Sequence, residues 1–210
     1  DVVYNNSDSS LRYGATITIP EGKGPFPAAV LITGSGAQDR DETLFGHKPF
    51  AVIADYLTKN GYIVLRVDDR GTGKSTGDFS KSTTEDFAKD VSNSVDYLLT
   101  RPEVDKKKIG LIGHSEGGMI APMVATSRKD IDFIVLLAAP GVRITELMAE
   151  QNAAILRSSG LSIEAVSEAK KLFKLLVSTI RGTSDSATAL QQVSMAMENW
   201  KAKQIGRAHV

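Results

Sequence analysis

One serine stands among neighbours that could make it a nucleophile. It lies in the segment Gly113-His114-Ser115-Glu116-Gly117, between a short apolar run and a stretch with helical spacing. A serine on a sharp turn between a strand and a helix faces the substrate, and its strained backbone needs small neighbours. Glycine at 113 and 117 meets that need. The pattern predicts nucleophilic catalysis by Ser115. The following helix, starting near Glu116, would direct its free N–H groups and positive dipole end at a developing oxyanion.

The composition excludes several other classes of function. The 210 residues hold 25 lysines plus arginines and 25 aspartates plus glutamates, so net charge gives no indication of a nucleic-acid partner. No cysteine is present, which excludes disulfides and thiolate chemistry. No apolar run reaches the roughly 18 residues of a membrane span. The chain begins at Asp1 without methionine, so we expect that any signal peptide or upstream domain has been removed. The sequence gives neither a localisation nor an oligomeric state.

Alternating strands and helices must position the serine. Strand-like runs are expected at 11–19, 28–33, 62–67, 109–112 and 133–138, the last four of them apolar enough for burial on both faces. Helical spacing falls between them, at 49–60, 83–98 and 116–127. Thr83 and Asp86 resemble a capping box at the start of the second of these helices. The alternation predicts an α/β fold with a mostly parallel central sheet and helices on both faces.

The pattern changes after Pro140-Gly141. No strand-like run follows Thr145, and three amphipathic helices are expected, with Ser162 capping the second. We predict a core over 1–142 and an inserted helical cap or lid over 143–204, with ordinary surface helices as the alternative.

The last six residues, 205–210, fit no packing face. One back-translation of them reads as a sequencing adapter, so we predict a non-native tail that includes His209.

Two loops suggest other chemistries, and each lacks a required residue. Gly73-Lys74-Ser75 resembles a phosphate-binding P-loop, but Asp68 occupies the place of its first glycine and would repel phosphate. Gly34-Ser35-Gly36 resembles a dinucleotide fingerprint, but Asp39 replaces the third glycine. Both remain remote alternatives.

The three histidines, His47, His114 and His209, are too scattered for a metal site. We expect no metal and no cofactor, and we expect His114 to pack or to hydrogen-bond locally.

Three motifs together carry a family resemblance: Thr33-Gly34-Ser35-Gly36, the segment from Asp69 to Ser75, and the segment from Gly113 to Gly118. Through them the chain resembles the α/β-hydrolase superfamily, and within it bacterial esterases and serine aminopeptidase-like hydrolases, over roughly residues 11–141. The resemblance implies a Ser-His-acid triad with Ser115 as nucleophile, acting on a small-molecule acyl substrate. It implies an oxyanion hole from the backbone N–H groups of Glu116 and Ser35, with Gly36 as the fallback.

The same resemblance places the loop after residue 33 at the rim of the pocket. Arg40 in that loop either contacts the substrate or pairs with a neighbouring acid, which is the commoner case.

The C-terminal third departs from the family. The triad acid and histidine should follow two further core strands, and the sequence shows none, so we expect both residues to be absent from this chain. The parent protein is then a serine hydrolase of an ester, thioester or amide. We expect this chain to be a C-terminally truncated, inactive fragment with residues 133–138 as an exposed apolar edge. The alternative is a non-catalytic binding module with the same fold.

Overall fold

The computed structural model describes residues 1–208, with side chains through Ala202. The chain divides into two compact units, Asp1–Pro140 and Gly141–Val210. Each unit is described by itself.

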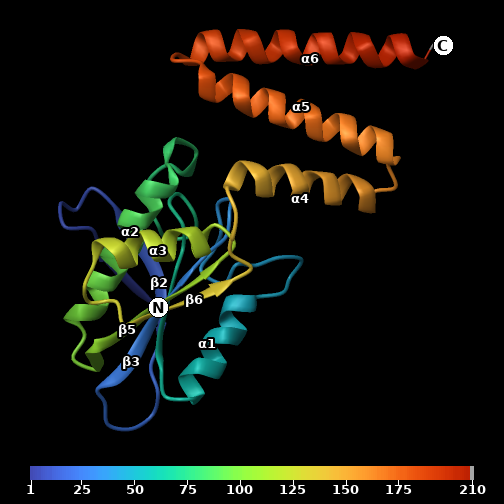
Figure 1. The fold of residues 1–210 in the computed structure, drawn as a ribbon. Coiled ribbons are helices and arrows are strands. Elements are labelled where there is room, and N and C mark those ends of the chain that lie inside the picture. Colours follow the sequence, from blue (N-terminus) through green and yellow to red (C-terminus); the bar gives the residue numbers. More distant parts are fainter. Residues whose placement is uncertain (209–210) are drawn as a thin grey trace. The chain divides into compact units, whose positions relative to one another are not determined.

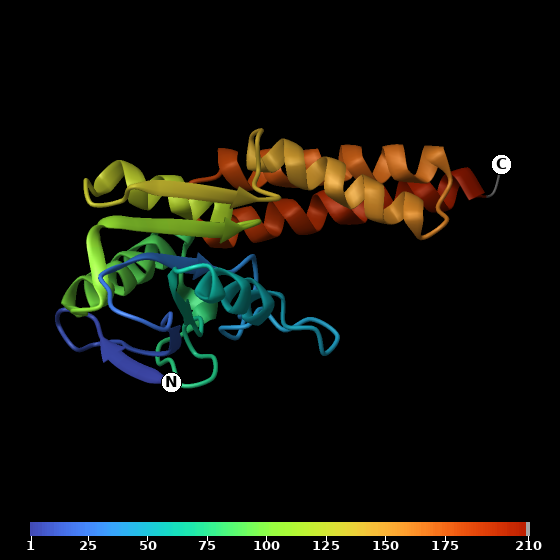
Figure 2. The same cartoon turned by 90° about the horizontal axis from the view of Figure 1, so that it is seen from below.

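The first unit is built on a six-stranded sheet with the order β1-β2-β4-β3-β5-β6 (Figures 1 and 2). Its strands are β1 (Val2–Asn5), β2 (Arg12–Thr18), β3 (Phe26–Ile32), β4 (Ile63–Val67), β5 (Val104–His114) and β6 (Phe133–Leu137). The pairs β3–β4, β3–β5 and β5–β6 are parallel, whereas β1 and β2 join the sheet antiparallel. The predicted α/β fold with a mostly parallel sheet is confirmed.

Both faces of the sheet are covered by helices. The alternation along β3 sends Ala28, Val30 and Ile32 into a core with α2 (Thr84–Thr100) and α3 (Gly117–Ser127). It sends Ala29 and Leu31 to the opposite face, where α1 (Pro49–Lys59) packs. Because the residues of β3 from Ala28 to Ile32 meet apolar neighbours on one face or the other, this part of the strand is a continuous apolar run.

The helix boundaries follow the signals in the sequence. Pro49 lies in the first turn of α1, where its missing N–H costs no hydrogen bond. The Thr83 side chain accepts from the N–H of Asp86, whose own side chain accepts from the N–H of Thr83. This reciprocal pair confirms the predicted capping box.

The edges of the sheet differ from the sequence prediction. Strand β1 was not predicted, and β6 was predicted as buried on both faces. In the structure β6 pairs with β5 on one side and has no second strand among residues 1–208. The side chains of Ile134, Val135 and Leu136 are 39–47% exposed. The prediction of burial was therefore wrong, because an apolar run does not reveal whether a neighbouring strand is present. The exposed edge expected from the absence of further strands is present.

The second unit consists of α4 (Ile144–Ser158), α5 (Ile163–Gly182) and α6 (Ser186–Ala208), joined by short turns. Ser162 caps α5 by accepting a hydrogen bond from the N–H of Ala165. Three helices without a strand were expected here, and within residues 141–208 the structure has them. Among the predicted tail residues, 205–208 belong to α6, while His209 and Val210 lie outside the described residues. No helix in the described part of the chain is long and apolar enough to cross a membrane.

Candidate active site

Ser115 occupies the turn between β5 and α3. Its backbone φ is +52°, a left-handed conformation that a residue with a side chain adopts only under constraint. The Ser115 N–H donates to the carbonyl of Leu137 at 2.9 Å, and the Gly118 N–H donates to the carbonyl of Ser115 at 3.0 Å. These two bonds fix the turn between neighbouring strand ends. Ser115 is half-buried.

The two glycines that flank the serine are required by packing. A Cβ atom on Gly113 would stand 2.0 Å from the carbonyl oxygen of Gly117, and one on Gly117 would stand 2.3 Å from that of Ile32. Both clashes are with backbone atoms, which cannot rotate away. Gly113 lets the end of β5 lie against the first turn of α3, and Gly117 lets that turn approach β3.

The first loop, residues 33–38, lies beside the serine. A Cβ atom on Gly34 would be 3.3 Å from the Cβ atom of Ser115. The loop follows β3 and the serine follows β5, and these parallel strands are direct neighbours, so their carboxyl ends meet at one edge of the sheet. Ligands of open parallel sheets bind at this edge.

The two predicted oxyanion donors are unpaired. Within residues 1–208, neither the N–H of Glu116 nor that of Ser35 donates to another group. Ser35 is exposed, and Gly36 after it has a left-handed φ of +99°. The Gly34 N–H, in contrast, is occupied by the carboxylate of Glu42 at 2.7 Å. The positions of Ser35 and Glu116 next to Ser115 are compatible with an oxyanion hole, and this assignment stays a prediction.

Glu116 also has a structural contact. Its carboxylate accepts a hydrogen bond from Thr84 Oγ1 at 2.7 Å. Because Thr84 is the first residue of α2, this bond ties the nucleophile turn to the neighbouring helix.

A second carboxylate, that of Asp69, holds the far end of the first loop. It accepts from Thr33 Oγ1 at 2.8 Å and from the N–H of Gln38 at 2.9 Å. Burial raises the pKa of Asp69 to about 7, although both of these hydrogen bonds act in the opposite direction. The negative charges of Asp90 and Glu42 raise it further. Asp69 therefore changes its protonation state near neutral pH.

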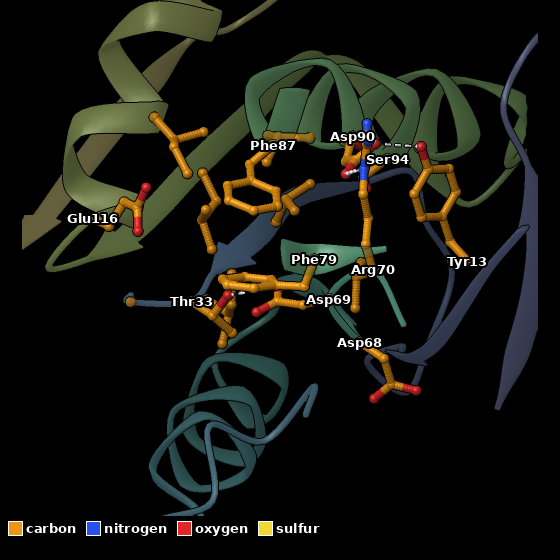
Figure 3. Close-up of a pocket in the computed structure, with 17 residues that line it drawn as sticks. Tyr13, Thr33, Asp68, Asp69, Arg70, Phe79, Phe87, Asp90, Ser94 and Glu116 are labelled. Atoms are coloured by element: carbon orange, nitrogen blue, oxygen red, sulfur yellow. Dashed lines mark hydrogen bonds and ion pairs between the residues drawn. The ribbon is translucent and has the colours of Figure 1, made fainter. Parts of the chain in front are cut away.

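A cavity of about 50 Å³ lies behind this loop (Figure 3). Its walls combine the stacked rings of Phe79 and Phe87 with the carboxylate of Asp69 and with Thr33. On another side Arg70 binds Asp90 through Nε at 2.6 Å and Nη2 at 2.9 Å. The volume is enough for a few water molecules.

Arg40 is engaged in an ion pair. Its guanidinium donates to both oxygens of Asp68, from Nε at 3.0 Å and from Nη2 at 2.6 Å. The side chains are 13% and 4% exposed. Burial alone would raise the pKa of Asp68, but the hydrogen bonds from Arg40 and from the N–H of Lys74 hold it below its usual value. Of the two alternatives left open by the sequence, the structure has the pairing with an acid.

Asp68 also explains the loop that resembles a P-loop. The N–H of Lys74 donates to Asp68 Oδ2 at 3.0 Å, and a Cβ atom on Gly73 would stand 2.3 Å from the same oxygen. The loop thus surrounds a carboxylate of its own chain, where a nucleotide phosphate would have to lie. In the loop that resembles a dinucleotide fingerprint, Asp39 Oδ1 accepts from the N–H groups of Asp41 and Thr43.

Among the described residues, no hydrogen bond joins a histidine to Ser115. His114 Nδ1 lies 2.7 Å from Glu42 Oε1, so His114 forms the hydrogen bond that was expected. His47 forms a short bridge with Leu44 at a loop tip. His209 is outside the described residues. No group of acids and histidines among residues 1–208 could hold a metal ion.

The sequence was compared with those of known protein families. The sequence profile of the X-Pro dipeptidyl-peptidase (S15) family matches residues 9–207. The chain belongs to this family. Among relatives of this S15-family chain, esterase EstD of Thermotoga maritima is 37% identical over 135 residues, which are 64% of this chain and 32% of EstD. Acyl-coenzyme A thioesterase 3 of Mus musculus is 29% identical over 136 residues, 60% of this chain and 26% of the thioesterase. The S15-family chain thus spans about a third or less of the length of these relatives.

Solved structures show the same fold. The α/β hydrolase GrgF from Penicillium superposes with a TM-score of 0.59 at 21% identity, covering 75% of the S15-family chain and 52% of GrgF. A Pyrococcus furiosus esterase superposes with a TM-score of 0.57 at 23% identity, covering 85% of the S15-family chain and 65% of that esterase. The fold is therefore that of the α/β hydrolases, and the resemblance drawn from the three motifs is confirmed.

Proposed function

We propose that this chain carries the nucleophile and the oxyanion hole of a serine hydrolase that cleaves carboxylic esters through an acyl-enzyme. The observation that carries the proposal is the left-handed backbone of Ser115, at φ +52°, enclosed by Gly113 and Gly117. A strained non-glycine conformation costs about 1–3 kcal/mol and persists where function needs it. A binding module that kept the fold alone would have no need for it. The esterase among the relatives supports the choice of an ester.

In the proposed reaction, Ser115 Oγ attacks the ester carbonyl carbon while a general base takes the hydroxyl proton. The carbonyl π electrons move to oxygen, and the N–H groups of Glu116 and Ser35 stabilise the resulting oxyanion, with Gly36 as the fallback donor. When the carbonyl re-forms, the C–O bond to the alcohol breaks, and the alcohol oxygen takes the proton from the base. Water then attacks the carbonyl carbon of the acyl-enzyme while the base takes its proton, the C–O bond to Ser115 Oγ breaks, and Oγ takes the proton back as the carboxylic acid leaves.

We propose further that the base is not supplied by residues 1–208. This is supported by the His114 ring, whose Nδ1 is engaged with Glu42. An imidazole in solution would then substitute for the absent side chain.

The helices of residues 143–204 are proposed to form a cap that selects the acyl or the leaving group. Their continuous helical sequence supports this division from the core. Substitutions on them should change the rate at which bulky esters acylate Ser115 in the presence of imidazole, and leave the labelling of Ser115 by a small probe unchanged.

The test is the labelling of the chain with a small fluorophosphonate, located by mass spectrometry, with and without added imidazole. We expect a label on Ser115 that forms faster with imidazole and is absent in Ser115→Ala. Ser35→Ala keeps its backbone N–H and serves as the matched control, since it removes another serine hydroxyl in the same site. No label on Ser115 under either condition would refute the nucleophile. Fast labelling that imidazole does not change would refute the absent base.

The same variants distinguish the substrate class. In the presence of imidazole, acyl transfer to Ser115 from a short p-nitrophenyl ester, an acyl-coenzyme A and an Xaa-Pro anilide can be compared by intact mass. We expect the ester to give the fastest Ser115-dependent acylation. A faster reaction with the thioester or the anilide would contradict the proposed substrate class.

A further inference from the structure

The carboxylate of Glu42 joins the first loop to the nucleophile turn. A single oxygen, Oε1, accepts the Gly34 N–H at 2.7 Å and lies 2.7 Å from His114 Nδ1. Glu42 is only 8% exposed, so water competes little for the contact with Gly34, whereas the His114 side chain is 42% exposed. Gly34 stands directly before Ser35, and His114 stands directly before Ser115. One buried oxygen thus contacts both chain segments from which the site is built.

The turn that carries Glu42 fixes the direction of its side chain. Glu42 has a left-handed φ of +52°, and its N–H donates to the carbonyl of Asp39 at 2.9 Å. The Asp39 carboxylate accepts the N–H groups on either side, from Asp41 and Thr43, each at 3.0 Å. The left-handed backbone conformation is unfavourable for glutamate, and these three bonds maintain it. Such constrained positions are common near functional sites.

The contact has a consequence for His114. An ionised carboxylate only accepts hydrogen bonds, so Glu42 selects the ring form in which Nδ1 carries the proton. The same oxygen then receives two N–H groups, one from each segment. Charge-assisted hydrogen bonds of this kind are shorter and stronger than neutral ones.

We propose that Glu42 is a positioning residue that sets the separation of the two oxyanion donors. The proposal rests on the proposed function, in which these donors are the N–H groups of Ser35 and Glu116. Ser35 follows the anchored Gly34, and Glu116 lies two residues beyond the anchored His114. If the clamp is lost, the first loop moves relative to the turn and the two donors no longer converge on one oxygen. Misplacement by about 1 Å is enough to cost roughly a hundredfold in rate.

The first experiment measures the clamp without any chemistry at Ser115. Amide hydrogen exchange by NMR is compared in the full chain, in Glu42→Ala and in Glu42→Gln, with Glu21→Ala as control because Glu21 is an exposed carboxylate in another turn. We expect exchange at Gly34 to accelerate at least about tenfold in Glu42→Ala, because its acceptor is lost. Glu42→Gln, which keeps a neutral acceptor, should lie between, and it replaces Glu42→Ala if that variant does not fold. The His114 ring nitrogens should lose their preference for the Nδ1–H form. Unchanged exchange at Gly34 in both variants overturns the proposal.

The second experiment measures the effect on the site. The saturable labelling of Ser115 by a fluorophosphonate with imidazole gives a binding constant and a maximal rate. In Glu42→Ala we expect the maximal rate to fall about a hundredfold, with the binding constant close to that of Glu21→Ala. Faster exchange at Gly34 without a slower labelling rate also overturns the positioning role. If the unaltered chain is not labelled at Ser115, the proposed function fails, and exchange at Gly34 alone decides whether Glu42 holds the loop.

Discussion

Thr33 Oγ1 donates a 2.8 Å hydrogen bond to Asp69, which links the ends of the neighbouring parallel strands β3 and β4. The same carboxylate accepts from the N–H of Gln38 and so fastens both ends of the first loop. This acid is also the one whose pKa burial raises to about 7. Its charge state and the attachment of the loop are therefore coupled.

The first prediction concerns the pH dependence of stability. In the unfolded chain Asp69 loses its proton near pH 4, whereas in the folded chain it keeps the proton to about pH 7. The folded state therefore binds more protons between these values, and stability falls as pH rises through this window. The stabilisation that comes from the raised pKa of Asp69 is complete below pH 4 and is lost above pH 7. With a shift of about three pH units, the change is on the order of 4 kcal/mol.

Asp69→Asn should remove this slope, because an amide does not titrate. Urea unfolding of both proteins between pH 4 and pH 9 gives the difference in their free energies of unfolding at each pH. The variant should gain stability relative to the unaltered chain as pH rises. Asp55→Asn, on the exposed side of α1, is the control and should run parallel to the unaltered chain. A constant difference between Asp69→Asn and the unaltered chain would contradict the raised pKa.

The second prediction concerns the pair formed by Arg40 and Asp68. Removing one partner of a buried ion pair leaves the other charge uncompensated and costs about 3–5 kcal/mol. Arg40→Met should therefore lower the free energy of unfolding by this amount, since Asp68 is 4% exposed in its side chain. Lys59→Met removes a cation whose partner Asp55 is 63% exposed, and this control should change stability by less than about 1 kcal/mol. Equal small effects of both substitutions, measured by urea unfolding, would contradict the stabilising role of the pair.

The sequence predicted those features that local chemistry determines. The capping box at Thr83, the helix that starts at Pro49 and the glycine-flanked serine all follow from residues within a few positions of one another. Each of these residue types is required by neighbours a few positions away in the sequence, so the sequence pattern was enough to predict the local structure.

Contacts between distant segments were not predictable in this way. Glu42 and His114 are 72 residues apart, and Thr33 and Asp69 are 36 apart. Each of these residues is of a type that is common on protein surfaces. Only the order of the strands in the sheet brings the members of each pair together. The acidic character of residues 39–42 was a signal that the loop is structured, but it did not identify which acid turns inward.

The third prediction tests the capping box. In Thr83→Ala the N–H of Asp86 loses its side-chain acceptor, and the start of α2 should weaken by about 1 kcal/mol. Thr83→Ser keeps the hydroxyl and should retain most of the stability. Thermal unfolding of the three proteins gives the comparison, and equal losses in both variants would assign the effect to the methyl group instead of the cap.

The last prediction concerns the glycines of the nucleophile turn. In Gly113→Ala the new methyl group would stand 2.0 Å from the carbonyl oxygen of Gly117, so one of two backbone segments has to move. Such overpacking costs about 1–3 kcal/mol and displaces Ser115. Gly141→Ala is the matched control, because nothing lies within 4 Å of its added methyl group. We expect Gly113→Ala to lose both stability and fluorophosphonate labelling of Ser115, while Gly141→Ala keeps both. Normal labelling of Ser115 in a stable Gly113→Ala protein would mean that the close approach of the turn to α3 is not what presents the serine.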